Sequence, residues 1–234
     1  MAVAPFLKDW TDPWRSYLAE FFGTFFFVLI SCWVLLSGSL YGNGSVIESA
    51  FAIGFAYSAL VFVTAHAAGG YLNPAITLSL WLVRRLSGSK TFFLIAAQIL
   101  AGFLAVEVLF LLFGQNAVQF HFGEPSLGLG ISMQTAFIVE AILTGGLVFA
   151  VFGTMVDRSG PISFGPLVLG LYLVAATIVA QPVSGEVLNP ARVIAPAVLS
   201  GGTAVLAVYV IGSLVGGLFA LLYEFIFLRK SRKK

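Results

Sequence analysis

Residues 69–77 read Gly-Gly-Tyr-Leu-Asn-Pro-Ala-Ile-Thr, and the triplet Asn-Pro-Ala returns at residues 189–191. Asparagine is a favoured N-cap residue, and proline is tolerated at the first helical position because the N–H that it lacks would have no partner there. Each triplet therefore predicts a helix that begins at its asparagine. The apolar stretches that follow, 73–83 and 189–199, have eleven residues each. Helices of that length reach about 16 Å, roughly half of a hydrocarbon core about 30 Å thick, so both are predicted to be half-helices.

The composition of the chain excludes a soluble globular protein. Of its 234 residues, 59% are hydrophobic and 9% are charged, whereas soluble domains carry about 25% charged residues. So few charges cannot cover a soluble globule of this size, and we therefore expect an integral membrane protein in contact with the lipid bilayer. The single cysteine, Cys32, excludes an internal disulfide and a multi-cysteine metal site. We expect no metal, no cofactor and no nucleic-acid partner.

Six apolar runs are long enough to cross a bilayer, which takes about 20 residues. They lie near residues 17–38, 46–66, 91–113, 131–155, 163–182 and 203–228. The half-helices fall between the second and third runs and between the fifth and sixth, so each half of the chain reads span, span, half-helix, span. Three spans per half invert the second copy relative to the first, as in the inverted repeats of many transport proteins. The predicted fold is an all-α membrane protein of six transmembrane helices plus two half-helices.

The basic residues orient the chain in the membrane. Eleven of the twelve lysines and arginines precede the first span, follow the last, or lie between spans two and three or four and five. These positions share one side of the bilayer, which the positive-inside rule makes cytoplasmic. We therefore expect a cytoplasmic N-terminal segment at 1–15, a channel domain at 16–228 and a basic cytoplasmic tail at 229–234, with both termini cytoplasmic. The repeats of the channel domain cover about 16–113 and 131–228.

The predicted topology brings the N-termini of the two half-helices together near the middle of the bilayer. Each N-terminus carries a partial positive charge of roughly half a unit, which opposes the passage of cations and hydronium. The amides of Asn73 and Asn189 can donate hydrogen bonds to a passing oxygen, and single-file water oriented in this way resists proton transfer. The candidate residues at this point are those of the two triplets: Asn73, Pro74, Ala75, Asn189, Pro190 and Ala191.

Glycine-bearing segments lead into both half-helices, at 66–72 and 182–188, and read as extended chain. Their carbonyl groups are expected to line the pore as a series of acceptors. His66 heads the first segment and is interpreted as a pore-lining or hydrogen-bonding residue, with a pH gate as the alternative. The backbone positions expected to line the pore are His66, Gly69, Gly70, Tyr71, Leu72, Val187 and Leu188.

These motifs resemble the aquaporin (major intrinsic protein) family over about residues 16–228. The matching stretches are Ala-Glu-Phe-Phe-Gly-Thr at 19–24, Gly-Gly-Tyr-Leu-Asn-Pro-Ala-Ile-Thr at 69–77, Ala-Gln-Ile-Leu-Ala-Gly at 97–102 and Asn-Pro-Ala-Arg at 189–192. The resemblance implies a homotetramer with one pore in each subunit. It also implies that Glu20 and Glu140 hydrogen-bond the backbone of the half-helix loops, which suits the need of an intramembrane carboxylate for partners.

The resemblance implies a selectivity filter as well, carried over position by position. Arg192 directly follows the second triplet and matches the family's filter arginine, which accounts for the one basic residue outside the cytoplasmic set. The water-selective pattern has an aromatic residue and a histidine where this chain has Ile53 and Thr177, so we expect a wider and less polar constriction. The glycerol-facilitator pattern also differs, at the positions of Val193 and Ala197. The four filter positions map to Ile53, Thr177, Glu186 and Arg192.

Glu186 stands where the family usually has a small residue, and two orientations of its side chain are open. In the first, the carboxylate pairs with Arg192, lowers the positive charge of the filter and partly occludes it. In the second, which the sequence alone favours, the side chain points into a side cavity and only the carbonyl group of Glu186 faces the pore.

The sequence as a whole predicts a passive channel for water, with some passage of small neutral solutes such as ammonia, hydrogen peroxide and glycerol, and with ions and protons excluded. An ion- or proton-coupled transporter is the alternative, with Glu107, Glu20 or Glu140 as the proton carrier, because inverted repeats also occur in that class. The paired triplets, with no acidic ion cage beside them, favour the channel. We expect no enzymatic activity, because the sequence has no nucleophile–base pair and no phosphate-binding loop.

Overall fold

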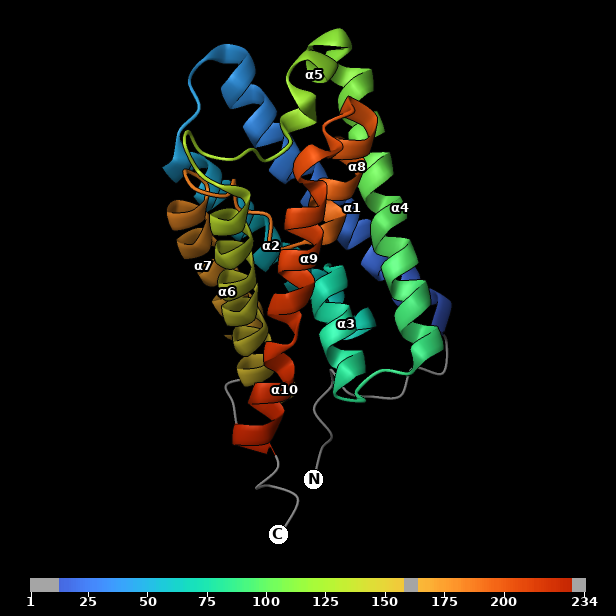
Figure 1. Ribbon diagram of the computed structural model, residues 1–234. Coiled ribbons are helices and arrows are strands. Elements are labelled where there is room, and N and C mark those ends of the chain that lie inside the picture. The colour runs from blue at the N-terminus through green and yellow to red at the C-terminus, as the bar shows by residue number, and fades with distance from the viewer. Residues whose placement is uncertain (1–12, 158–163, 229–234) are drawn as a thin grey trace.

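The computed structural model describes residues 13–157 and 164–228, and these residues form helices joined by loops. Most of the expected N-terminal segment at 1–15 and all of the expected basic tail at 229–234 lie outside the described residues. In Figure 1 the start of the first helix and the end of the last helix both lie toward the lower end of the molecule, and the short helix α5 (Gln115–Gln119) lies at the upper end.

The helices follow the predicted order in both halves of the chain. The first half consists of α1 (Pro13–Tyr41), α2 (Val46–Ala68), the short helix α3 (Pro74–Leu82) and α4 (Gly88–Phe113). After α5 and the 3-10 turn η2 (His121–Gly123), the second half begins with α6 (Met133–Val151), continued by the π-helical turn η3 (Phe152–Val156). It goes on with α7 (Gly165–Ala180), the short helix α8 (Pro190–Ser200), the 3-10 turn η5 (Thr203–Val205), α9 (Leu206–Gly217), α10 (Phe219–Tyr223) and the π-helical turn η6 (Glu224–Leu228).

Five segments among the described residues are long and apolar enough to cross a membrane: Trp14–Tyr41, Val46–Ala68, Gly88–Phe113, Met133–Val156 and Thr203–Leu228. The sixth predicted span, near 163–182, corresponds to α7, which has 16 residues. At 1.5 Å per residue α7 reaches about 24 Å, less than a hydrocarbon core of about 30 Å. The described helix begins at Gly165, followed by Pro166, and ends before the turn at residues 181–184.

Both half-helices begin at the predicted asparagines, so this prediction is confirmed. The Asn73 side chain accepts a hydrogen bond from Ala75 N at 2.8 Å, and the Asn189 side chain accepts one from Ala191 N at 3.0 Å. Both asparagines have extended backbone, and a proline occupies the first turn of each helix. α3 has nine residues and α8 has eleven. In Figure 1 α3 lies in the lower half of the molecule and α8 in the upper half.

The two halves of the chain pack on each other through equivalent helices. α1 packs on α2 and α4, and in the same manner α6 packs on α7 and α9, while α2 and α7 pack together. A Cβ added at Gly54 in α2 would lie 2.5 Å from the Gly170 carbonyl oxygen, and one added at Gly170 in α7 would lie 2.5 Å from the Gly54 carbonyl oxygen. Small residues at these positions let the two backbones come close together. Close packing of this kind stabilises helix pairs in lipid, where no hydrophobic force drives helices together.

The close approach of α2 and α7 generates a prediction about stability. We expect Gly54→Ala and Gly170→Ala each to lower the free energy of unfolding by about 1–3 kcal/mol, because the new methyl group meets backbone that cannot rotate away. Thermal unfolding in detergent, followed by size exclusion, measures the effect. Gly88→Ala is the matched control, since its Cβ would meet Trp81 at an ordinary 3.6 Å. Equal melting temperatures for the three variants would contradict the prediction.

Candidate functional site

The asparagines of the two triplets reach across to each other's loops. Asn73 Nδ2 donates a hydrogen bond to the carbonyl oxygen of Leu188 at 2.8 Å, and Asn189 Nδ2 donates one to the carbonyl oxygen of Leu72, also at 2.8 Å. Asn73 and Asn189 are buried. An amide nitrogen carries two N–H groups, so each asparagine retains one donor beyond this exchange. The N-termini of α3 and α8 therefore meet with two spare donors close to the point of contact.

Glu20 in α1 holds the loop before α3. Its carboxylate accepts hydrogen bonds from Tyr71 N at 2.8 Å and from Leu72 N at 2.7 Å. Gln98 in α4 donates a third bond to it at 2.7 Å and a further bond to Thr77 in α3 at 2.9 Å. Sequence reasoning missed the role of Gln98, and its signal was an amide in the middle of an apolar span.

Glu140 in α6 holds the loop before α8 in the same manner. Its carboxylate accepts hydrogen bonds from Val187 N at 3.1 Å, from Leu188 N at 2.8 Å and from the Ser184 hydroxyl at 2.6 Å. Leu188 (φ 50°) and its counterpart in the first loop, Leu72 (φ 49°), both adopt left-handed backbone. Residues other than glycine populate this region rarely and persist there only when the surroundings enforce it. The two carboxylates supply that enforcement.

The first loop is shorter than the sequence predicted. Helix α2 continues to Ala68 and ends at Gly69, whose φ of 109° is left-handed. His66 therefore lies in the last turn of α2 with an exposed side chain, so the expectation that its backbone belongs to the pore-lining loop is wrong. The apolar pattern runs unbroken through Ala68, and the glycine that follows is a common C-cap signal. Gly70, Tyr71 and Leu72 form the loop itself, with the Tyr71 carbonyl accepting a hydrogen bond from the Tyr57 hydroxyl at 2.8 Å.

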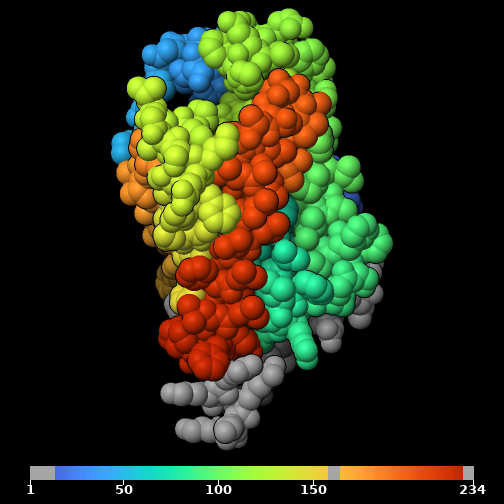
Figure 2. Space-filling view, in the orientation of Figure 1, coloured from blue at the N-terminus to red at the C-terminus, as the bar shows by residue number. Residues whose placement is uncertain are grey.

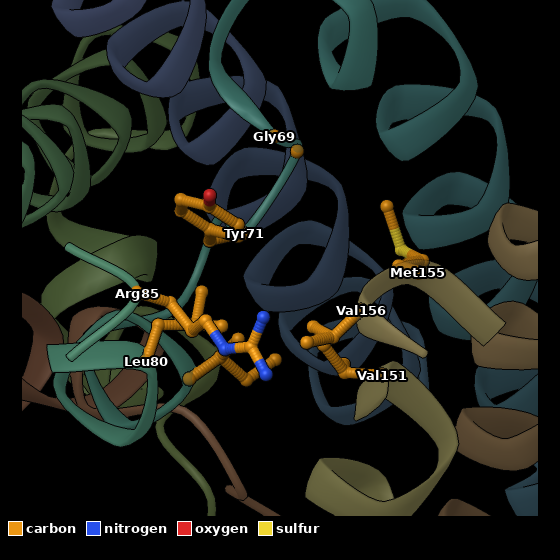
Figure 3. A pocket seen from close by; sticks show the side chains of 9 residues that line it. Gly69, Tyr71, Leu80, Arg85, Val151, Met155 and Val156 are labelled. Atoms are coloured by element: carbon orange, nitrogen blue, oxygen red, sulfur yellow. The ribbon is translucent and has the colours of Figure 1, made fainter. Parts of the chain in front are cut away.

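A narrow cavity of about 40 Å³ lies beside the first loop. Gly69 and Tyr71 line it on one side, and Val151, Met155 and Val156 line it on the other (Figure 3). Gly70 also lines it. The remaining lining residues are Ile76, Leu80 and Arg85, and the guanidinium of Arg85 points toward the valines in Figure 3. Arg85 Nη2 also lies 3.2 Å from Glu224 Oε2. Sequence reasoning counted Arg85 only as a cytoplasmic charge, although its place directly after a half-helix was a signal.

A larger hollow of about 510 Å³ lies toward the opposite end of the molecule. It is bounded by the end of α1, the start of α2, the loop at 123–126, Gln181 and Gly185. In Figure 2 an opening is visible between the blue chain near residues 38–44 and the yellow-green chain near residues 120–126. Glu124 lines this hollow, accepts a hydrogen bond from the Ser200 hydroxyl at 3.1 Å, and has the pKa of its carboxyl raised by burial.

The four positions mapped to a filter come from four different segments: Ile53 from α2, Thr177 from α7, Glu186 from the second loop and Arg192 from α8. Each is at most 1% exposed. Arg192 Nη1 donates to both the carbonyl oxygen and the carboxylate of Glu186. The Thr177 side chain also interacts with this carboxylate, while its hydroxyl donates a hydrogen bond to the Leu173 carbonyl oxygen at 2.8 Å. The orientation of Glu186 favoured from the sequence is therefore wrong, since the carboxylate pairs with Arg192 instead of pointing into a side cavity.

The remaining nitrogens of Arg192 have no hydrogen-bond partner within residues 13–157 and 164–228. Nε and Nη2 are buried and make no hydrogen bond with the described residues. A guanidinium presents its donors in a fixed fork, so these two N–H groups are available to an acceptor oxygen that enters the site. The site thus has two kinds of buried donor, the N–H groups at Nε and Nη2 of Arg192 and the spare amide N–H of each asparagine.

The sequence pattern that defines the family described as Major intrinsic protein matches residues 7–223. The chain belongs to this family. Among similar proteins, Aquaporin TIP4-4 of Zea mays is 35% identical over 223 residues, covering 92% of this chain and 87% of that protein. Aquaporin Z of Photorhabdus laumondii is 31% identical over 222 residues, covering 87% of this chain and 94% of that protein.

A solved structure shows the same fold. The chain is similar to the aquaglyceroporin from Plasmodium falciparum with a TM-score of 0.83, over 95% of this chain and 100% of that one, at 22% identity. Together with the helices described above, this likeness confirms the predicted fold of the Major intrinsic protein family, with its spans and two half-helices in an inverted repeat.

The carboxylates that hold the loops generate a prediction for this Major intrinsic protein. We expect Glu20→Gln and Glu140→Gln to lower the free energy of unfolding by about 1–3 kcal/mol each, because an amide nitrogen would face buried backbone donors and leave one unsatisfied. Glu107→Gln makes the same chemical change at an exposed position of α4 and serves as the control. Thermal unfolding in detergent compares the three, and variants at positions 20 and 140 that melt with the control would contradict the assigned contacts.

Proposed function

We propose that this chain is a passive channel for water and for other small neutral solutes, and that it excludes ions and protons. The observation that carries the proposal is the reciprocal exchange between Asn73 and Asn189, which joins the N-termini of two half-helices and leaves one amide donor on each. Membership of the Major intrinsic protein family and similarity to proteins named aquaporins support it. Nothing in this mechanism requires catalysis or a cofactor.

The proposed path runs from the large hollow, past Arg192, between the two asparagines and into the narrow cavity beside Tyr71. A solute oxygen first meets the free Nε and Nη2 donors of Arg192 and then the amide donors of Asn73 and Asn189. These donors, met one after another along the path, replace the hydrogen bonds that a water molecule loses when it leaves bulk solvent. The positive ends of α3 and α8 face the same point and raise the energy of any cation there.

The residues around Arg192 set the proposed solute range. Ile53 and Thr177 are smaller than an aromatic residue and a histidine, and neither adds a charge. A constriction of this kind accepts small neutral solutes in addition to water, and ammonia, hydrogen peroxide and glycerol are the candidates to be tested. We further propose a homotetramer with one pore per subunit and both termini in the cytoplasm, on the resemblance and the distribution of basic residues. Native mass spectrometry tests the assembly.

A coupled transporter is the second candidate, because the chain buries the carboxylates Glu20 and Glu140 at membrane depth. Each accepts hydrogen bonds from two backbone N–H groups and one side chain, which favours a structural group fixed in place over a mobile proton carrier. Glu107, the third candidate carrier, lies exposed on α4. These contacts favour the channel.

Reconstituted protein tests the proposed function directly. In stopped-flow osmotic experiments we expect proteoliposomes to shrink about tenfold or more faster than empty vesicles, because a pore replaces the partition of water into hydrocarbon. Parallel measurements with glycerol, ammonia and hydrogen peroxide define the solute range. We expect no dependence of flux on an imposed proton or sodium gradient. Water flux equal to that of empty vesicles, or solute flux driven by either gradient, would reject the passive channel.

The charge of Arg192 generates a separate prediction. We expect Arg192→Val to admit protons or small cations, because it removes a buried positive charge and leaves the Glu186 carboxylate without its partner. Arg192→Lys retains a positive charge and should retain most of the barrier. Arg84→Gln, at an exposed position after α3, controls for the loss of a positive charge elsewhere. Vesicles loaded with a pH-sensitive dye measure the leak, and equal leaks for the valine variant and this control would contradict the role of Arg192.

A further inference from the structure

The glutamate beside Arg192 breaks the symmetry between the two half-helix loops. Glu186 precedes Asn189 by three residues, and the residue three before Asn73 is Gly70. Both adopt left-handed backbone, with φ of 56° at Glu186 and 64° at Gly70. Glycine adopts this conformation freely, whereas a residue with a Cβ is disfavoured by roughly 1 kcal/mol or more. The strained position therefore carries a side chain that the fold itself does not require.

The Glu186 side chain interacts with two of the three other filter positions. Its carboxylate contacts Arg192 on α8 and Thr177 on α7, while the Glu186 carbonyl oxygen contacts Arg192 as well. The side chains of Glu186 and Arg192 are each 1% exposed, although the hollow of about 510 Å³ reaches Gly185 beside them. The carboxylate thus takes up donor capacity of the arginine that a permeating oxygen would otherwise use.

The charges around this pair favour the uptake of a proton. Glu140 in α6 also acts on Glu186, so two buried carboxylates share one arginine and leave one negative charge in excess. Two carboxylates in a site of low polarity do not both remain ionised without cost. Glu140 accepts hydrogen bonds from two backbone N–H groups and Ser184, and these bonds hold its carboxylate in place and favour its charged form. Glu186 is held by side chains alone, so it is the member free to accept the proton.

Other groups near the pair come from every surrounding element. Ile53 of α2 and Thr177 of α7 are uncharged, while Cys32 of α1 and Tyr209 of α9 are buried and carry a thiol and a phenol, which are neutral at pH 7 by their ordinary pKa values. Glu124, from the loop after η2, adds a more distant negative charge, with His121 beside it. Within the described residues Arg192 is thus the one positive charge at this level, and the surrounding carboxylates disfavour a second ionised group on the path.

We infer that Glu186 is a proton-controlled latch on the outer filter: paired with Arg192 it holds the path closed, and protonated it releases the arginine and opens the path. This inference rests on the proposed channel function and adds its regulation. Protonation turns the ion pair into a weaker hydrogen bond and removes the excess negative charge. The freed N–H groups of Arg192 then bind the permeating oxygen. Acid opens the latch, and neutral or basic conditions close it.

Osmotic water permeability of proteoliposomes tests the latch, with the same pH inside and outside so that the orientation of the protein does not matter. Measurements at about pH 5 and about pH 8 lie on either side of the range in which a perturbed carboxylate titrates. We expect the wild type to be about threefold or more faster at the acid value, as a mostly closed gate becomes mostly open. Glu186→Gln and Glu186→Gly should be fast at both values. Glu107→Gln, at an exposed site on α4, should respond as the wild type does.

Each other outcome overturns the latch. A pH response that survives in Glu186→Gln places the titrating group elsewhere, and a response lost in Glu124→Gln identifies Glu124 as that group. Glu186 variants that elute as folded protein yet stay slow at both values show that the carboxylate does not close the path. A wild type that exceeds empty vesicles but matches its Glu186 variants at both values refutes the latch and leaves the channel intact. Flux no faster than empty vesicles in every protein refutes the channel and the latch together.

Discussion

Backbone polar groups inside a membrane need partners from the protein, because lipid provides none. Two loops of this chain leave helical geometry at membrane depth, and the rest of the structure is arranged to satisfy them. Glu20 and Glu140 each accept two backbone N–H groups, while Asn73 and Asn189 each donate to a carbonyl of the opposite loop. This set of hydrogen bonds allows α3 and α8 to stop at the middle of the molecule. It also leaves donors at their meeting point, from which the proposed conduction follows.

The two halves of the chain share this framework and differ in what they add to it. Both loops place leucine in the left-handed region directly before the asparagine, and both depend on a buried carboxylate from the first helix of their own repeat. The second half adds a buried pair of opposite charges, Glu186 in its loop and Arg192 in α8. Charged groups buried together are weak evidence for stability, since their desolvation offsets much of their attraction. The presence of a charged side chain at the strained position 186, paired with Arg192, is therefore better explained by selectivity and its regulation than by a contribution to folding.

Sequence reasoning succeeded for features that depend on local chemistry. N-capping by Asn73 and Asn189, the length of the half-helices and the repeated order of spans all follow from residue types and spacing. It was less successful at boundaries and orientations. His66 proved helical because the apolar pattern continues to Ala68, and α7 proved shorter than the apolar run that predicted it. Gln98 and Arg85 were passed over because their contacts join segments far apart in the chain.

The sequence by itself determined the class of this protein: a membrane chain of two inverted halves, each with a capped half-helix. Composition, hydrophobic length and the Asn-Pro-Ala triplets are local properties, and the bilayer admits few folds that satisfy them. Only the tertiary structure decided how Glu186 is used. Its side chain had two open orientations, and the choice depended on the positions of Arg192 and Thr177, which reach it from two other helices. The energy of a buried charge is set by its neighbours in space, and the order of residues along the chain does not specify those neighbours.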